Sequence, residues 1–310
     1  MRRLLQKSDV ILAGLLAALL LPAWLLPERY WPALCRRLAR RPWLTDPRAL
    51  ARNAANIQAG LGEPDPRRAE AIALELEAGI RELHLQDLRA WRPGPGWPGA
   101  WQPAVALEGE AHLLQALAEG KGAILWVAHQ VFSNVTPKLA LRRRGHRVFH
   151  LSSVEHGDAK SRLGIALLNP LRCIPERRHL AARIVVDRRA PAKAVQRLAR
   201  ALKAGDVVTI SAVATEGISV LEMPFLGGRA RLAPGAPRLA AQTGAPLLPL
   251  FALRDPAIGF RVIIEAPIAL PPAPSSDERS LAAAAEFLRR AEPWVRQFPG
   301  QWRGWNKWAR

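Results

Sequence analysis

Residues 120–134 read GKGAILWVAHQVFSN, and this stretch decides the architecture of the chain. The run Gly122–Ala128 is apolar throughout and short, as expected of a strand that is buried on both faces. His129 follows it directly. Because α/β folds hold their active sites at the carboxyl ends of such strands, His129 is the first candidate functional residue.

Short apolar runs alternate with helical segments from Val105 onward. This alternation predicts an α/β domain with a mixed central sheet flanked by helices. Further strands are expected at Val148–Leu151, Val207–Val213, Pro246–Leu253 and Phe260–Glu265. Helices are expected at His112–Ala118, Asn134–Arg143, Pro191–Lys203, Ala233–Gln242 and Asp277–Arg296.

The N-terminal part has a different pattern. Val10–Leu26 is an unbroken apolar run of 17 residues, near the lower limit for a helix that crosses a bilayer. Basic residues lie on both sides of it, so a helix that dips into one leaflet fits as well as one that spans. A signal peptide and a buried core helix are the alternatives. Two helices follow, one capped by Thr45-Asp46 and running to Gly62, the other over Pro66–Trp91.

These patterns predict three parts. Residues 1–44 form a membrane anchor with a basic flank, residues 45–104 a helical extension, and residues 105–310 an α/β domain with a C-terminal helix and a Trp/Arg-rich tail. In that tail, Trp302, Trp305 and Trp308 recur among basic residues. This composition is typical of a segment at a membrane interface.

The formal net charge is +19, which raises the local concentration of anionic partners. Nucleic acid, anionic lipid headgroups and an acidic carrier protein all qualify. The chain carries no nucleic-acid-binding motif, and its apolar N-terminus favours lipid, so no nucleic acid is expected. The two cysteines, Cys35 and Cys173, have no metal-like spacing, and no zinc motif occurs. No metal is therefore expected.

The His129 segment and three later segments resemble, in order, the sequence blocks of the glycerolipid (lysophospholipid) acyltransferase superfamily. His129 stands at the block I histidine, and residues 185–219 are similar to the next two blocks. GAPLLPLF (244–251) is similar to the fourth block, and residues 223–249 are most similar to the lipid A (lauroyl-type) branch. The matching residues in the middle blocks are Arg188 or Arg189, Gly205, Glu216 and Gly217.

The resemblance implies transfer of a fatty acyl group from a thioester, on acyl carrier protein or coenzyme A, to a hydroxyl or amine of a lipid or glycolipid. His129 would be the general base. Arg188 or Arg189 would hold a phosphate of the acceptor, and Glu216 with Gly217 would contact the acceptor. No metal or redox cofactor is implied. The implied location is the cytoplasmic face of the inner membrane.

The family carries a carboxylate five positions after the histidine, where this chain has Asn134. An amide oxygen can accept the ring N–H, but it cannot neutralise an imidazolium. Asn134 is a candidate both to orient His129 and to form the N-cap of the helix that follows, and the two roles are compatible. Alternatively, Glu155, Asp158 or Asp187 supplies the acid. A second hypothesis for the whole chain is a protein of the same fold that binds lipids or partners without turnover. A third hypothesis is a basic nucleic-acid-binding protein.

Overall fold

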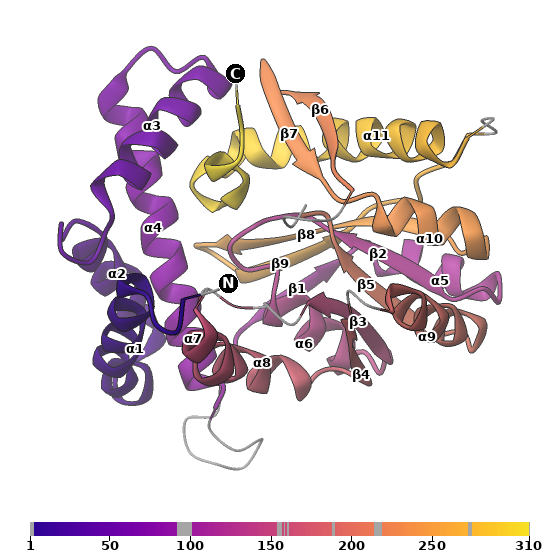
Figure 1. Ribbon diagram of the computed structural model, residues 1–310, viewed down its shortest axis with the longest axis horizontal. Coiled ribbons are helices and arrows are strands. Elements are labelled where there is room, and N and C mark those ends of the chain that lie inside the picture. Colours follow the sequence, from indigo (N-terminus) through magenta and orange to yellow (C-terminus); the bar gives the residue numbers. More distant parts are fainter. Residues whose placement is uncertain are drawn as a thin grey trace.

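The computed structural model describes residues 3–91, 101–153, 157, 159, 161–187, 190–213, 219–271 and 275–309. Its centre is a seven-stranded sheet in the order β1-β9-β8-β2-β5-β3-β4 (Figure 1). Its strands are β1 (Val105–Glu108), β2 (Ala123–Val127), β3 (Val148–Ser153), β4 (Ala182–Val186), β5 (Val207–Ser211), β8 (Leu247–Asp255) and β9 (Gly259–Ile264). A separate antiparallel ribbon consists of β6 (Leu221–Phe225) and β7 (Gly228–Leu232).

The strand that carries the GKGAILWVA motif lies in the middle of the sheet. β2 pairs in parallel with β5 on one side and β8 on the other, and all five of its residues are buried. The sheet is mixed because β8 and β9 pair antiparallel across a short turn, while the other pairs are parallel. The predicted fold class, a mixed sheet flanked by helices with an apolar N-terminal helix, is confirmed.

Helices cover both faces of the sheet, and alternate side chains of β2 pack against the helices on opposite faces. Leu125 packs with residues of α5 (Glu110–Ala118) and α6 (Val135–Arg143). Ile124 and Trp126 belong to the larger core on the other face. That core includes residues of α9 (Pro191–Lys203), α10 (Gly235–Thr243) and α11 (Ser276–Gln297). Two further helices, α7 (Arg162–Leu167) and α8 (Asn169–Arg177), follow β3.

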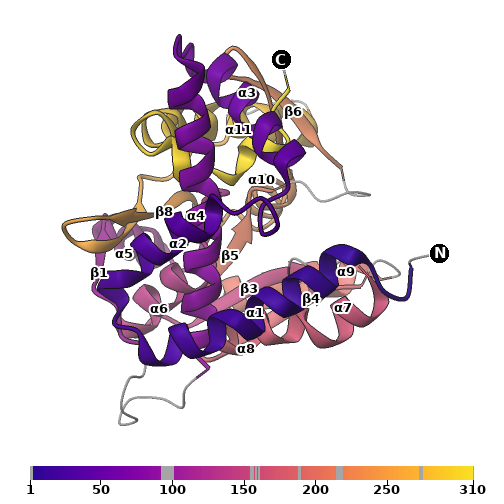
Figure 2. The ribbon, with the colours of Figure 1, turned by 90° about the vertical axis from the view of Figure 1, so that its left-hand side faces the viewer.

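A layer of helices from the N-terminal part packs beside the sheet (Figure 2). Its members are α1 (Lys7–Leu25), the short η1 (Glu28–Tyr30), α2 (Trp31–Ala39), α3 (Pro47–Leu61) and α4 (Pro66–Arg89). The Asp46 side chain caps α3 by accepting from the Arg48 amide, and Gly62 ends the helix in the left-handed conformation. Of the described helices, α1 alone is long and apolar enough to cross a membrane. The division into anchor, extension and α/β domain stays a prediction.

The interfacial role predicted for the Trp/Arg-rich tail is wrong. Trp302, Trp305 and Trp308 are 8%, 0% and 4% exposed, and they pack edge to face on one another in η2 (Pro299–Gln301), η3 (Arg303–Asn306) and the residues after them. The Asn56 amide of α3 donates to the carbonyls of Trp305 and Trp308, at 2.7 and 3.1 Å. Burial of indole rings with their N–H groups bonded stabilises the contact between the tail and the helical layer.

Candidate active site

His129 lies half-buried just past the carboxyl end of β2. The chain's C-terminal tail fixes its backbone: the His129 carbonyl accepts from the Arg303 amide at 3.0 Å, and the Val131 amide donates to the Gln301 carbonyl at 2.9 Å. These two bonds flank an antiparallel bridge between Gln130 and Trp302. The buried tryptophans therefore hold the histidine loop in place, which is a structural role in the site.

A cavity of about 360 Å³, named the polar cavity for the polar and charged side chains among its lining residues, opens at His129. It lies at the carboxyl ends of β2, β3 and β5 and beside the start of α6. Hydroxyl, amide, imidazole and cationic side chains line it, among them Asn134, Lys138, His150, Arg172, Thr209 and Arg303. This lining suits a ligand with hydroxyl and anionic groups.

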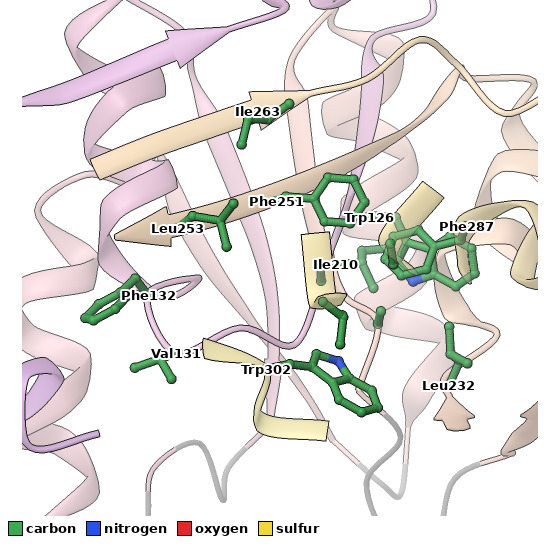
Figure 3. Packing of buried hydrophobic residues seen from close by; sticks show 14 of the residues in the cluster. Trp126, Val131, Phe132, Ile210, Leu232, Phe251, Leu253, Ile263, Phe287 and Trp302 are labelled. Atoms are coloured by element: carbon green, nitrogen blue, oxygen red, sulfur yellow. The ribbon is translucent and has the colours of Figure 1, made fainter. Parts of the chain in front are cut away.

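His129 also lines a smaller cavity of about 40 Å³, named the apolar cavity for its lining residues. It is lined mainly by side chains of β7, β8, α11 and the tail, including Leu232, Phe251, Phe287 and Trp302. Figure 3 shows these four side chains gathered around this end of the sheet. His129 thus lines both cavities, one with mainly apolar side chains and one with many polar and charged side chains.

Asn134 belongs to a buried network. Its Oδ1 accepts from Lys138 Nζ at 3.2 Å, one helical turn along α6. Lys138 forms an ion pair with Glu176 of α8. The same Glu176 carboxylate lies 3.4 Å from His150 Nε2, and His150 Nδ1 lies 2.9 Å from the Thr209 hydroxyl. The network joins α6, α8, β3 and β5 beneath the polar cavity.

The network also fixes which way the Asn134 amide points. An ammonium group has only donors, so the atom facing Lys138 must be the amide oxygen. The amide nitrogen is buried and has no hydrogen-bond partner among the described residues. Asn134 occupies the N-cap position of α6, but its side chain makes no capping bond. The predicted N-cap role is therefore wrong, because Lys138 engages the oxygen that would cap.

Burial dominates the electrostatics of this network. The side chains of Lys138 and Glu176 are 4% and 0% exposed. Desolvation lowers the pKa of Lys138, and the ion pair with Glu176 opposes that shift. Asn134 therefore contributes an uncharged amide that is held by a buried cation, whose own counterion is Glu176.

The other predicted site residues are only partly placed. Arg188, Arg189, Glu216 and Gly217 lie outside the described residues, as do Glu155 and Asp158. Asp187 is exposed at the end of β4. β4 lies three strands from β2, roughly 14 Å at the usual strand spacing, which is too far for a direct hydrogen bond between Asp187 and His129.

Sequence reasoning missed the partners of Asn134. The spacing of Asn134 and Lys138 on a predicted helix contained a usable signal, since residues four apart share a face. No sequence signal pointed to Glu176, because helix α8, which carries it, was not expected. Cys35 and Cys173 are both buried, and neither forms a disulfide. Within the part of the chain that the structure describes, no cluster of three or more His, Cys, Asp or Glu side chains is placed to hold a metal ion.

The fold and the site define a class: an α/β protein with a histidine at the end of the central strand that lines two cavities. The profile of the bacterial lipid A biosynthesis acyltransferases matches residues 5–305, and the chain belongs to this family. Comparison with curated proteins gives no match. Family membership supports acyltransferase activity, and members of this kind are associated with membranes.

Proposed function

We propose that the protein is a membrane-associated acyltransferase that moves a fatty acyl group from a thioester to a hydroxyl or amine of a lipid or glycolipid. The observation that carries the proposal is the position of His129 between the two cavities. The apolar side chains of the smaller cavity suit contact with the acyl chain, which this cavity of about 40 Å³ must widen to admit, and the larger cavity suits the acceptor. The proposed location is the cytoplasmic face of the inner membrane, where α1 would contact the bilayer.

His129 is the proposed general base. It takes the proton from the acceptor O–H or N–H while that atom attacks the thioester carbonyl. When the C–S bond breaks, the imidazolium returns the proton to the departing thiol, so the histidine ends the cycle neutral. The reaction requires no metal or redox cofactor. The net charge of +19 favours an acidic acyl carrier protein or a coenzyme A thioester as donor, and we propose no nucleic-acid partner.

We propose that Arg188 or Arg189 binds a phosphate group of the acceptor. Glu216 and Gly217 are proposed to contact the acceptor as well. These roles rest on the family resemblance alone. The structure gives separate support for an anionic acceptor, because the cationic side chains of Arg172 and Arg303 line the same cavity as His129. A guanidinium binds phosphate oxygens through two parallel bonds.

The proposal is tested with the full chain purified in detergent. Acyl carrier protein and coenzyme A thioesters are supplied in turn with a lipid acceptor. We expect release of free thiol in step with acylated lipid detected by mass spectrometry. Binding of lipid without thiol release from either donor would instead favour the alternative, a member of the fold that has lost turnover because of Asn134.

Asn134→Asp is expected to raise kcat/KM by about ten- to a hundredfold, a fraction of the ~10⁴ that separates Asp from Asn in the serine protease triad. One oxygen of a carboxylate here would keep the bond with Lys138, and the other is proposed to accept the ring N–H of His129 and stabilise the imidazolium. The initial rate of thiol release measures the change. Asn134→Leu, which has similar volume and no acceptor, is the matched control and should lower the rate. If Asn134→Asp lowers the rate as well, the site is built around the amide and its bond with Lys138.

A further inference from the structure

The N-terminal end of the apolar helix α1 is bonded to the α/β body. Asp9 is 2% exposed, and its carboxylate accepts from the Ser161 amide at 3.0 Å, just before α7. The carbonyls of Arg3 and Leu4 accept from the amides of Arg162 and Leu163, each at 3.1 Å. This end of α1 is therefore fixed to α7 through three backbone amides.

The C-terminal end of α1 is bonded to the same body. The Trp24 indole N–H donates to the Leu88 carbonyl at 3.1 Å. Arg89 Nη1 donates to the carbonyls of Ala23 and Trp24, each at 2.8 Å. Both partners lie in the last turn of α4, which packs on α8. The Trp91 indole N–H continues that contact by donating to the Leu171 carbonyl of α8 at 2.8 Å.

These ties conflict with a helix that crosses a bilayer. Nineteen residues at about 1.5 Å each give a helix of about 28 Å, close to the ~30 Å hydrocarbon thickness. A spanning α1 would separate its two ends by that thickness, whereas α7, α8 and the end of α4 are parts of one packed body. Figure 2 shows α1 lying lengthwise along α7 and α8.

The outward face of α1 is apolar along its length. Val10, Ile11, Leu21 and Leu25 are 53%, 43%, 67% and 74% exposed. A continuous apolar helix face on a protein surface marks a membrane or protein contact.

Cations and exposed aromatic side chains follow α1 along the chain. Arg36, Arg37, Arg40 and Arg41 of α2 and its end line an open concavity. Tyr30 precedes α2 and is 47% exposed, and Trp43 follows it and is 72% exposed. An apolar face followed by arginines and exposed aromatics matches a leaflet of anionic phospholipid, because the arginines can pair with headgroup phosphates.

We infer that α1 does not cross the membrane: it lies in the plane of one anionic leaflet, with its exposed face among the acyl chains and the α2 arginines on the phosphates. The inference rests on the membrane association proposed above and assigns its geometry. It places both ends of α1 on the same side of the membrane as the α/β body.

Labelling of single introduced cysteines tests the geometry. Arg3→Cys marks the N-terminal end, and Gln196→Cys, exposed on α9, marks the body. The unmodified chain gives the background of the buried Cys35 and Cys173. We expect a membrane-impermeant maleimide to label both variants in inside-out vesicles and to lose both signals in intact spheroplasts.

The outcomes separate the inference from the proposed function. Labelling of Arg3→Cys and Gln196→Cys from opposite sides would overturn the in-plane geometry and leave acyl transfer and membrane association standing. Recovery of the chain in the soluble fraction would overturn both the geometry and the proposed membrane association. Labelling from the same side, with the chain in the membrane fraction, supports the inference.

A matched pair of charge variants tests the headgroup contact. Arg37→Gln/Arg40→Gln on α2 is compared with Arg197→Gln/Arg200→Gln on α9, where both arginines are exposed at the same spacing. Vesicles of phosphatidylglycerol and phosphatidylcholine are the probe. At about fivefold per arginine near a charged surface, the α2 pair should weaken binding by about 25-fold. Equal weakening by the two pairs would overturn the placement of α2 at the headgroups.

Discussion

His129→Ala is expected to lower kcat/KM for acyl transfer by about 10² to 10⁴, the usual contribution of a positioned general base. Without the imidazole, the acceptor must attack the thioester carbonyl as a neutral hydroxyl or amine, or give up its proton to water. The same assay of thiol release and acylated lipid measures the loss. The effect should fall on kcat more than on KM, since the base acts as the acceptor attacks and not on binding.

The His129→Ala variant should remain folded. The bonds that hold this loop run through the His129 carbonyl and the Val131 amide, and they do not involve the imidazole. His112→Ala, on α5 and also half-buried, removes a histidine that lines neither cavity and should leave the rate unchanged. An unchanged product yield from His129→Ala would show that this histidine is not the base and would leave a binding role for the site.

Patterns within short windows predicted most of the fold. The apolar run before His129 became the central strand, and the expected strands and the helices after it agree with the structure to within two residues at each end. The hydrophobic pattern did not predict elements whose burial depends on residues far away in the sequence. β1 and β4, the two edge strands of the main sheet, were not expected, and neither was the ribbon of β6 and β7. α7 and α8 are short helices whose contacts come from α1 and α4. No local periodicity distinguishes such segments from loops.

The candidate site shows the same division. The position of His129 at the end of the central strand was predictable, because the buried strand before it is a local signal, and its role as a base stays a prediction. The environment of Asn134 was not, since Glu176 reaches Lys138 only through tertiary packing of α8 on α6. The prediction for the tail was wrong for a related reason: a segment rich in tryptophan and arginine has the same composition whether its tryptophans face lipid or a protein core. Only the contact with α3 shows that Trp305 is fully buried.

Glu176→Ala is expected to destabilise the protein by about 3–5 kcal/mol, because it leaves Lys138 as a buried cation without its counterion. Both side chains are almost fully inaccessible, so solvent cannot replace the lost partner. Denaturant unfolding of the detergent-solubilised protein, followed by tryptophan fluorescence, measures the change. Glu292→Ala is the control, since its pair with Arg296 on α11 is exposed and should contribute less than about 1 kcal/mol.

The pH dependence of the variant identifies Lys138 as the cause. Burial already holds the pKa of Lys138 below its usual range, and removal of Glu176 takes away the interaction that opposes this shift. Between the lowered folded pKa and the unfolded value near 10.4, the unfolded chain binds the proton that the folded chain has released, so stability rises with pH. The deficit of Glu176→Ala should therefore shrink as the pH rises through this window. The double variant Lys138→Met/Glu176→Leu removes both charges at similar volume, and it should recover most of the loss and show no such rise. A double variant as unstable as Glu176→Ala would mean that the carboxylate acts through His150 instead.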